Sequence, residues 1–142
     1  MISGFFGPMR FLSNFFEVKV SYNGLIFTNA EAAFQAQKDP NRASEFVNLG
    51  PKQAKSLGRR VHLRSDWDSV KCQIMLDILR AKFADPVLRL QLARTAPQVL
   101  IEANTWGDRF WGVCNGSGSN VLGLLLMRVR DEILSSANGN KE

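Results

Sequence analysis

Residues 28–38 have the sequence TNAEAAFQAQK, and the other predicted elements are arranged around this stretch. It predicts a short helix on which Glu31, Gln35 and Lys38 project from one face, because residues three or four positions apart are neighbours on a helix. Phe34 lies beside that line. An acid, an amide and a base next to an aromatic ring are residue types suited to the wall of a binding site.

The same stretch has a second interpretation. Thr28 and Glu31 have the spacing of a capping box, in which the threonine accepts a hydrogen bond from a helix amide and the glutamate accepts one from the cap amide. In that case Glu31 serves the start of the helix, and Gln35 and Lys38 are solvated. The pattern of residues 28–38 alone leaves both interpretations open.

A β-hairpin is predicted immediately before this helix. Residues 16–20 alternate apolar and polar side chains, which is the period of a half-buried strand. Asn23 and Gly24 can both adopt positive φ angles in a tight turn, and residues 25–27 return as the partner strand. The hairpin would give Glu31 a rigid base.

The remaining elements are mostly helical. Apolar spacing, with proline or glycine at the ends, predicts helices at residues 41–49, 51–57, 65–83, 86–94 and 121–134 and a short strand at 99–103. A chain of 142 residues is long enough for one domain. We therefore predict a compact single domain of α+β class, mostly helical, with a short β-hairpin or small sheet, at residues 1–135. The small polar tail at 136–142 is expected to be disordered.

Arginines near the N-terminus and in the middle of the chain are candidate phosphate ligands. Arg10, Ser13 and Asn14 lie among aromatic residues, where they would either face a ligand or lie on the surface. Arg59 begins residues 59–64, in which three arginines alternate with apolar residues. This pattern fits either an exposed strand edge or a phosphate-binding segment.

Residues 104–112, NTWGDRFWG, are the most unusual part of the sequence. Two tryptophans and a phenylalanine surround the acid–base pair Asp108 and Arg109. The glycine-serine segment 115–120 follows and leads into the last predicted helix. Backbone amides at such a loop-to-helix junction can bind an anion, so Gly118 and Asn120 are candidates for a phosphate site.

Composition and charge narrow the protein class. The net charge of +5 and the pI near 9.6 favour phosphate-bearing partners or nucleic acid. The two cysteines lack a paired metal spacing and histidine occurs once, so we expect no metal ion and no cofactor. We recognise neither a signal peptide nor a membrane span and expect a soluble, cytoplasmic protein with no membrane partner.

Together these residue types suit cleavage of a bond between ribose and a heterocycle. Carboxylates would stabilise an oxocarbenium-like sugar centre, flat aromatic rings would stack a base, and arginines would hold phosphate. No serine–histidine–acid or cysteine–histidine arrangement stands out. The groups are Glu31, Asp108, Lys38, Trp67, Trp106, Trp111, the arginines and the glycine-rich loop.

A set of short motifs occurs along the chain in an order that points to one protein family. They are Phe11-Leu12-Ser13-Asn14-Phe15, Glu31-x-x-Phe34-Gln35-Ala36-x-Lys38, Ala54-Lys55-x-x-Gly58-Arg59, Trp67, Lys82-Phe83, Asp108-x-x-Trp111-Gly112 and Asn120-x-Leu122-Gly123-x-x-Leu126-Met127-x-x-Arg130. The chain resembles the NADAR family, also called YbiA-like, over nearly its whole length. It departs from the family pattern at Ala32, where the family often has histidine.

The resemblance implies a compact α+β, mostly helical domain that hydrolyses N-glycosidic bonds of ribosylated compounds. Two substrate classes go with the family: ADP-ribose on guanine in nucleic acid, and phosphorylated ribosylamino-pyrimidine intermediates of riboflavin biosynthesis. The basic charge favours the first. A non-catalytic module that binds ADP-ribose or NAD is a further alternative, and no protein partner is indicated.

The site hypothesis combines both lines of reasoning. The resemblance carries functional roles over to Glu31, Trp67, Asp108 and Trp111. Our own hypothesis for Lys38 is that it either binds a phosphate or ribose hydroxyl, or attacks the opened sugar to form a Schiff base. The expected catalytic residues are Glu31, Lys38 and Asp108. The expected substrate-binding residues are Arg10, Ser13, Asn14, Gln35, Arg59, Trp67, Trp111, Gly112, Gly118 and Asn120.

Overall fold

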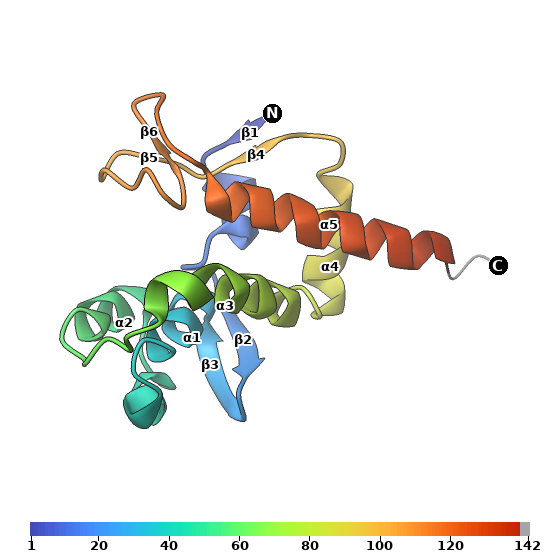
Figure 1. The fold of residues 1–142 in the computed structure, drawn as a ribbon. Helices are drawn as coiled ribbons and strands as arrows, with labels where there is room; N and C mark the ends of the chain where they lie inside the picture. Colours follow the sequence, from blue (N-terminus) through green and yellow to red (C-terminus); the bar gives the residue numbers. More distant parts are fainter. Residues whose placement is uncertain (140–142) are drawn as a thin grey trace. The chain divides into compact units, whose positions relative to one another are not determined.

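The computed structural model describes residues 1–139, and these residues fall into two units (Figure 1). The central unit is Asn14–Lys82, and the terminal unit joins Met1–Ser13 to the chain from Phe83 onward. The fold is α+β and mostly helical, with short strand pairs, as the sequence predicts. The assignment of one domain to residues 1–135 stays a prediction.

The hairpin of the central unit is confirmed. Strand β2 (Glu17–Tyr22) pairs antiparallel with β3 (Leu25–Asn29). Asn23 and Gly24 form the turn with φ angles of 48° and 80°, which is the left-handed region that an Asn-Gly turn requires. Strand β3 extends beyond the predicted end at residue 27, and this extension changes how the next helix begins.

Helix α1 (Ala30–Ala36) is the buried element of the central unit, because every one of its residues is buried. It contacts α2 (Pro51–Gly58) and α3 (Trp67–Lys82) as well as both strands of the hairpin. The predicted helix at 41–49 is a 3₁₀ helix, η2 (Pro40–Phe46). Alanines in α1 let its neighbours approach closely, and the two polar side chains Glu31 and Gln35 are buried with them.

Within its described residues, the terminal unit contains two short parallel strand pairs, a 3₁₀ helix and two α-helices, of which α5 is the longer. Its elements are β1 (Ile2–Ser3), η1 (Gly7–Leu12), α4 (Pro86–Arg94), β4 (Leu100–Ile101), β5 (Ala103–Asn104), β6 (Val113–Cys114) and α5 (Val121–Gly139). Strand β1 pairs with β4, and β5 pairs with β6. Helix α5 contacts β4 and α4, and it buries Leu122, Leu126, Val129 and Ile133 at helical spacing.

Helix α5 also corrects the predicted tail. It continues to Gly139, whereas the sequence predicts a helix end at 134 and disorder from 136. The rest of that predicted tail, residues 140–142, lies outside the described residues. None of the helices within residues 1–139 has the length and apolar character needed to cross a membrane.

Candidate active site

Helix α1 begins one residue later than a capping box would require. The cap is Asn29, whose side-chain oxygen accepts the N–H of Ala32 at 2.7 Å. The Thr28 hydroxyl instead donates to the Leu49 carbonyl at 3.2 Å. The capping-box interpretation is therefore wrong, because Thr28 lies in β3 and Asn29 occupies the cap position.

The Glu31 carboxylate is buried and held by a neighbouring amide. Its residue is 8% exposed, and the Gln35 side chain donates from Nε2 to Glu31 Oε1 at 3.2 Å. Gly58 at the end of α2 fixes this amide, since a Cβ at that position would overlap Gln35 Oε1. That oxygen is buried and accepts no hydrogen bond within the described residues. The close approach of α2 therefore fixes Gln35, and Gln35 orients Glu31.

Lys38 lies beyond the end of α1, in the turn that follows it, rather than on the predicted helix face. Its backbone N–H donates to the Gln35 carbonyl at 3.1 Å, and its own carbonyl accepts the Arg64 N–H at 2.9 Å. Burial lowers the pKa of Lys38, and the negative charge of Glu31 partly offsets this effect. The side chain is thus anchored close enough to Glu31 for the two to interact electrostatically.

Two aromatic rings lie beside these groups. Trp67, the first residue of α3, is 8% exposed, and its ring centroid lies 5.0 Å from that of Phe34. The Lys38 ammonium lies 5.9 Å from the Trp67 ring, within the range of a cation–π contact. Trp67 therefore joins α3 to the polar groups of α1 and its following turn.

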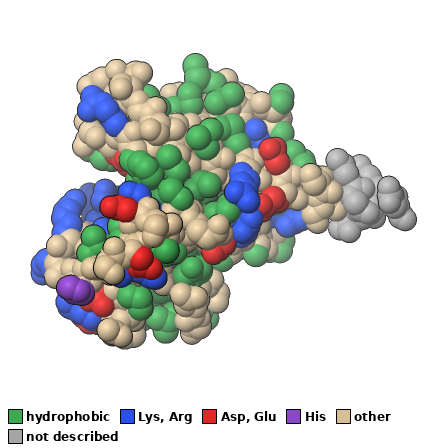
Figure 2. Space-filling view, viewed as in Figure 1, with side chains coloured by type: hydrophobic (Ala, Val, Ile, Leu, Met, Phe, Trp, Pro, Cys, Tyr) green, Lys and Arg blue, Asp and Glu red, His purple; other side chains and the backbone are tan. Residues whose placement is uncertain are grey.

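Basic side chains in α2 and directly after it lie near Lys38. Arg59 follows α2 as an exposed residue, and both Arg59 and Lys55 lower the pKa of Lys38 through charge repulsion. Lys55 Nζ lies 5.8 Å from the ring of Phe15. Lys and Arg side chains gather on the surface over α2 and the turn after it (Figure 2). Residues 59–64 form no strand, so the strand-edge interpretation is wrong.

Asn14 lies at the edge of the central unit, directly against Glu31. Its carbonyl accepts the Glu31 N–H at 3.1 Å, and its side-chain Nδ2 donates to Met75 Sδ at 3.4 Å. The residue is 8% exposed, and its Oδ1 is buried without a hydrogen-bond partner in residues 1–139. An unsatisfied buried acceptor is costly unless a donor reaches it, which suits a ligand hydroxyl.

Arg10 and Ser13 belong to the terminal unit. Arg10 is exposed in η1, and its carbonyl accepts the N–H of the half-buried Ser13 at 2.9 Å. Both remain candidates for ligand binding by their position in the sequence motif.

Asp108 organises the loop in which it lies. Its Oδ1 accepts the backbone N–H groups of Phe110 at 3.2 Å and Trp111 at 3.0 Å. Its own N–H and carbonyl are bonded by the side chain of Asn104, at 3.1 and 2.9 Å. Turn chemistry thus explains one carboxylate oxygen, and a catalytic role for Asp108 stays a prediction. Trp111 is half-buried, with its ring 4.8 Å from that of Phe110.

The backbone amides at the junction before α5 are paired with the preceding loop, and the anion site expected there stays a prediction. The backbone N–H groups of Ser119, Asn120, Val121 and Leu122 donate to the carbonyls of Arg109, Gly112, Phe110 and Trp111 respectively. These donors were expected to face phosphate. Because they are already paired with the preceding loop, a phosphate would have to replace those hydrogen bonds to bind there.

Gly112, Gly118 and Asn120 have clear structural roles. A Cβ at Gly112 would overlap the Glu102 carbonyl, and one at Gly118 would overlap the Gly112 carbonyl. Asn120 bonds β4 and its flank through both side-chain atoms, donating to Leu100 O and accepting from Glu102 N, each at 2.9 Å. Close packing accounts for these residues, and their contact with substrate stays a prediction.

The central unit brings Glu31, Gln35, Lys38 and Trp67 together, and Asn14 and Arg59 lie beside members of that group. The other candidates, with Asp108 and Trp111 among them, belong to the terminal unit. Sequence reasoning missed Asn29 as the cap and Gly58 as the residue that fixes Gln35. The signal for Asn29 was present, since asparagine is as good a cap as threonine; the role of Gly58 appears only when α1 and α2 pack.

Comparison with known proteins agrees with the motifs. A family model described as the NADAR domain matches residues 4–134. N-glycosidase YbiA of Shigella sonnei (strain Ss046) is 40% identical over 128 residues, covering 85% of this chain and 79% of that protein. Riboflavin biosynthesis protein PYRR of Zea mays is 35% identical over 139 residues, but these cover 84% of this chain and 22% of the maize protein.

A solved structure is also similar. The NMR structure of the E. coli protein YbiA matches with a TM-score of 0.84 and 35% sequence identity, covering 96% of this chain and 87% of that one. The family match at 4–134 includes the motif residues of both units. Sequence, family model and fold therefore lead to one conclusion, which is that this chain belongs to the NADAR family.

Proposed function

We propose that this protein is an N-glycosidase that removes ADP-ribose from ADP-ribosylated guanine in nucleic acid. The broader part of the proposal, a hydrolase acting on N-glycosyl bonds, is supported by relatives named N-glycosidase that align with most of this chain. The narrower part, the substrate, is supported by the charge of +5 and the basic side chains around α2. One observation carries the chemistry: a buried carboxylate, Glu31, is held by Gln35 next to Lys38.

Glu31 is the group that acts at the ribose anomeric carbon. As a carboxylate it accepts a proton from the attacking water and stabilises the positive charge that develops on the sugar. The C–N bond then breaks, its electron pair remains on the base nitrogen, and a proton is delivered there. Trp67 offers a ring against which the base or ribose can pack. The roles proposed for Asp108, in ribose binding or proton transfer, and for Trp111, as a ring for base or ribose, rest on the family motif.

Lys38 has two possible roles that differ in chemistry. It either holds a phosphate or ribose hydroxyl, or its neutral amine attacks C1′ of the ring-opened ribose. In the second case water leaves to form a Schiff base, and hydrolysis later restores the amine. The lowered pKa of Lys38 increases the fraction of the side chain that is a neutral amine. Only the neutral amine is a nucleophile, so the direction of this shift favours the Schiff base over phosphate binding.

The other binding groups follow from local geometry. Arg10 and Arg59 are exposed arginines suited to phosphate, since a guanidinium forms paired hydrogen bonds with phosphate oxygens. The unpaired Asn14 Oδ1 is an acceptor for a ribose hydroxyl. Gln35 acts through Glu31 as a positioning residue, because its Nε2 bonds that carboxylate.

The test compares substrates and a single isosteric substitution. Wild type, Glu31→Gln and the control Glu17→Gln, an exposed glutamate of β2, are incubated with a guanine-ADP-ribosylated oligonucleotide, ribosylamino-pyrimidine phosphate and free NAD. Mass spectrometry detects the products. We expect wild type and Glu17→Gln to release ADP-ribose from the oligonucleotide, and Glu31→Gln to be at least about a hundredfold slower, as loss of a general base implies. Full activity in a folded Glu31→Gln protein would remove Glu31 from the mechanism.

Two alternative functions give different results in the same experiment. Cleavage of the ribosylamino-pyrimidine phosphate alone would support a role in riboflavin biosynthesis, which the name of the maize relative favours. That match covers only 22% of the maize protein, so the printed name has limited weight for this chain. Binding without cleavage of any substrate would support a non-catalytic ADP-ribose or NAD module, for which the Glu31–Gln35 hydrogen bond has no evident use.

A further inference from the structure

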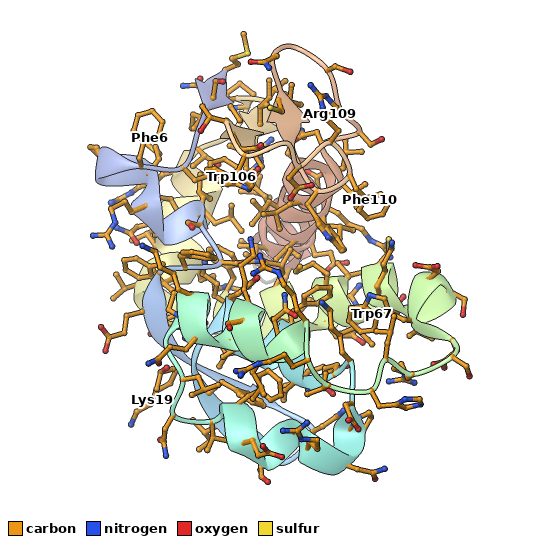
Figure 3. All side chains as sticks on the ribbon, turned by 90° about the vertical axis from the view of Figure 1, so that its left-hand side faces the viewer. Phe6, Lys19, Trp67, Trp106, Arg109 and Phe110 are labelled. Atoms are coloured by element: carbon orange, nitrogen blue, oxygen red, sulfur yellow. The ribbon has the colours of Figure 1, made fainter. Side chains whose placement is uncertain are left out.

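The loop between β5 and β6, residues 105–112, exposes large aromatic side chains that the proposed chemistry does not use. Trp106 is 65% exposed and Phe110 is 38% exposed. Figure 3 shows both along this loop, with Arg109 between them in the sequence. An exposed tryptophan leaves a flat apolar ring in water, and a nucleic-acid base can cover such a ring by stacking on it.

The exposure is not a result of an irregular chain. Asn104 bonds both the N–H and the carbonyl of Asp108, and Asp108 in turn accepts two loop amides. The Ser119 N–H also donates to the Arg109 carbonyl at 2.8 Å. These hydrogen bonds fix the loop backbone at residues 108–111 before any ligand binds, which lowers the entropy cost of ordering the segment that carries Arg109.

The charge of this surface is also defined by these contacts. Residues 105–119 contain one acid and one base, Asp108 and Arg109. Asp108 is half-buried and its carboxylate bonds the loop's own amides, whereas Arg109 is exposed. A flat apolar ring and an exposed positive charge three residues apart on one loop match a nucleic-acid strand, which offers unstacked bases and phosphates at every step.

We propose that the β5–β6 loop binds single-stranded nucleic acid, with Trp106 stacking on a base and Arg109 contacting a phosphate. The inference rests on the proposed function, because it names the macromolecule that carries the ADP-ribosylated guanine. It adds a contact surface that a free nucleotide substrate would not need. We therefore expect substitutions in the Glu31 group to slow the chemical step and substitutions in this loop to weaken strand binding.

The test measures binding without chemistry. The probe is an unmodified, fluorescein-labelled single-stranded DNA of about 12 nucleotides, within the usual range of such sites. Fluorescence anisotropy at low salt should give about tenfold weaker binding for Trp106→Ala, while Trp106→Phe keeps a stacking ring and binds nearly as wild type. The matched control is Leu124→Ala, which truncates an exposed apolar side chain of α5 in the same unit and should bind as wild type.

The charge contribution has its own control. Arg109→Gln should reduce the slope of log affinity against log salt by about 0.7, the value for one phosphate contact on a single strand. Arg94→Gln, at an exposed arginine of α4, should leave the slope unchanged. Equal thermal unfolding of all the variants confirms that the loop changes are local.

The outcomes separate this inference from the proposed function. If Trp106→Ala binds the DNA as wild type does, or if wild type does not bind it, the inference is overturned even when the ADP-ribosylated oligonucleotide is cleaved. If Trp106→Ala instead loses self-association in sedimentation and keeps DNA binding, the loop is a protein interface and the inference is again overturned. If Trp106→Ala loses DNA binding but wild type cleaves none of the substrates, the surface stands and the proposed function fails.

Discussion

Lys82 makes the stability of this protein depend on pH in a predictable direction. It is the last residue of α3, is 0% exposed, and its ammonium lies 5.9 Å from the ring of Phe16. Burial lowers its pKa from 10.5 to about 7. Between these two values the unfolded chain holds a proton that the folded chain has lost, so the free energy of unfolding rises with pH. Below about pH 7 both states are protonated and the contribution is constant.

The size of the effect follows from the two pKa values. Each pH unit inside the window is worth about 1.4 kcal/mol, and the rise from pH 7 to pH 9 is about 2 kcal/mol because Lys82 is still half protonated at its lower limit. Lys82→Met removes the ionisable group but keeps an unbranched apolar stem, so its stability should lack this rise. The control Lys19→Met changes an exposed lysine of β2 and should keep it.

Urea denaturation at pH 7, 8 and 9 measures the three proteins under the same conditions. The informative quantity is the difference between wild type and Lys82→Met at each pH, because every other titrating group contributes equally to both. The conclusion that Lys82 loses its proton in the folded protein would be refuted by a wild-type free energy of unfolding that does not change with pH. It would also be refuted by a Lys82→Met protein that shows the same rise.

Two further predictions concern the Glu31 group. Gly58→Ala places a Cβ against Gln35 Oε1, so it should destabilise the fold by about 1–3 kcal/mol and reduce kcat. The control Gly50→Ala, whose Cβ would lie 3.6 Å from Gln53 Oε1, should keep its activity. Equal kcat in both variants would contradict the role of Gln35. If Lys38 acts as an amine, the rate should rise with pH, with a midpoint below 10.5 because burial lowers the pKa, and borohydride should trap an adduct that Lys38→Arg cannot form. Turnover without any trapped adduct would leave only the binding role.

Local patterns predicted much of the fold because the forces that set them are local. The Asn23-Gly24 turn, the start of α4 at Pro86 and the start of α2 at Pro51 depend on residues within a few positions, and the structure confirms them. The parallel pairs of β1 with β4 and β5 with β6 were not predicted. Each strand has two residues, which is too short to show a period, and the β1–β4 partners lie far apart in the sequence.

The candidate site was predicted in composition but not in geometry. Motif positions led to Glu31 and Lys38, yet the helix face assumed for Lys38 is wrong because α1 ends at Ala36. The choice between Thr28 and Asn29 as cap depends on where β3 ends, which is decided by pairing with β2 rather than by either residue. Similarly, the glycine-serine segment has the composition of an anion site, but the carbonyls of residues 109–112 occupy its junction amides.

The hydrogen bonds between those carbonyls and the start of α5 limit which changes the loop can accommodate. A helix normally begins with amides that lack partners, and here the preceding loop supplies acceptors for Val121 and Leu122. An insertion in the loop would move these acceptors and expose the helix end, so we expect a change in loop length to destabilise the start of α5. The exposed side chains of Trp106 and Arg109 take no part in these backbone hydrogen bonds. We therefore expect substitutions at these two positions to change which molecules the protein binds without altering the fold.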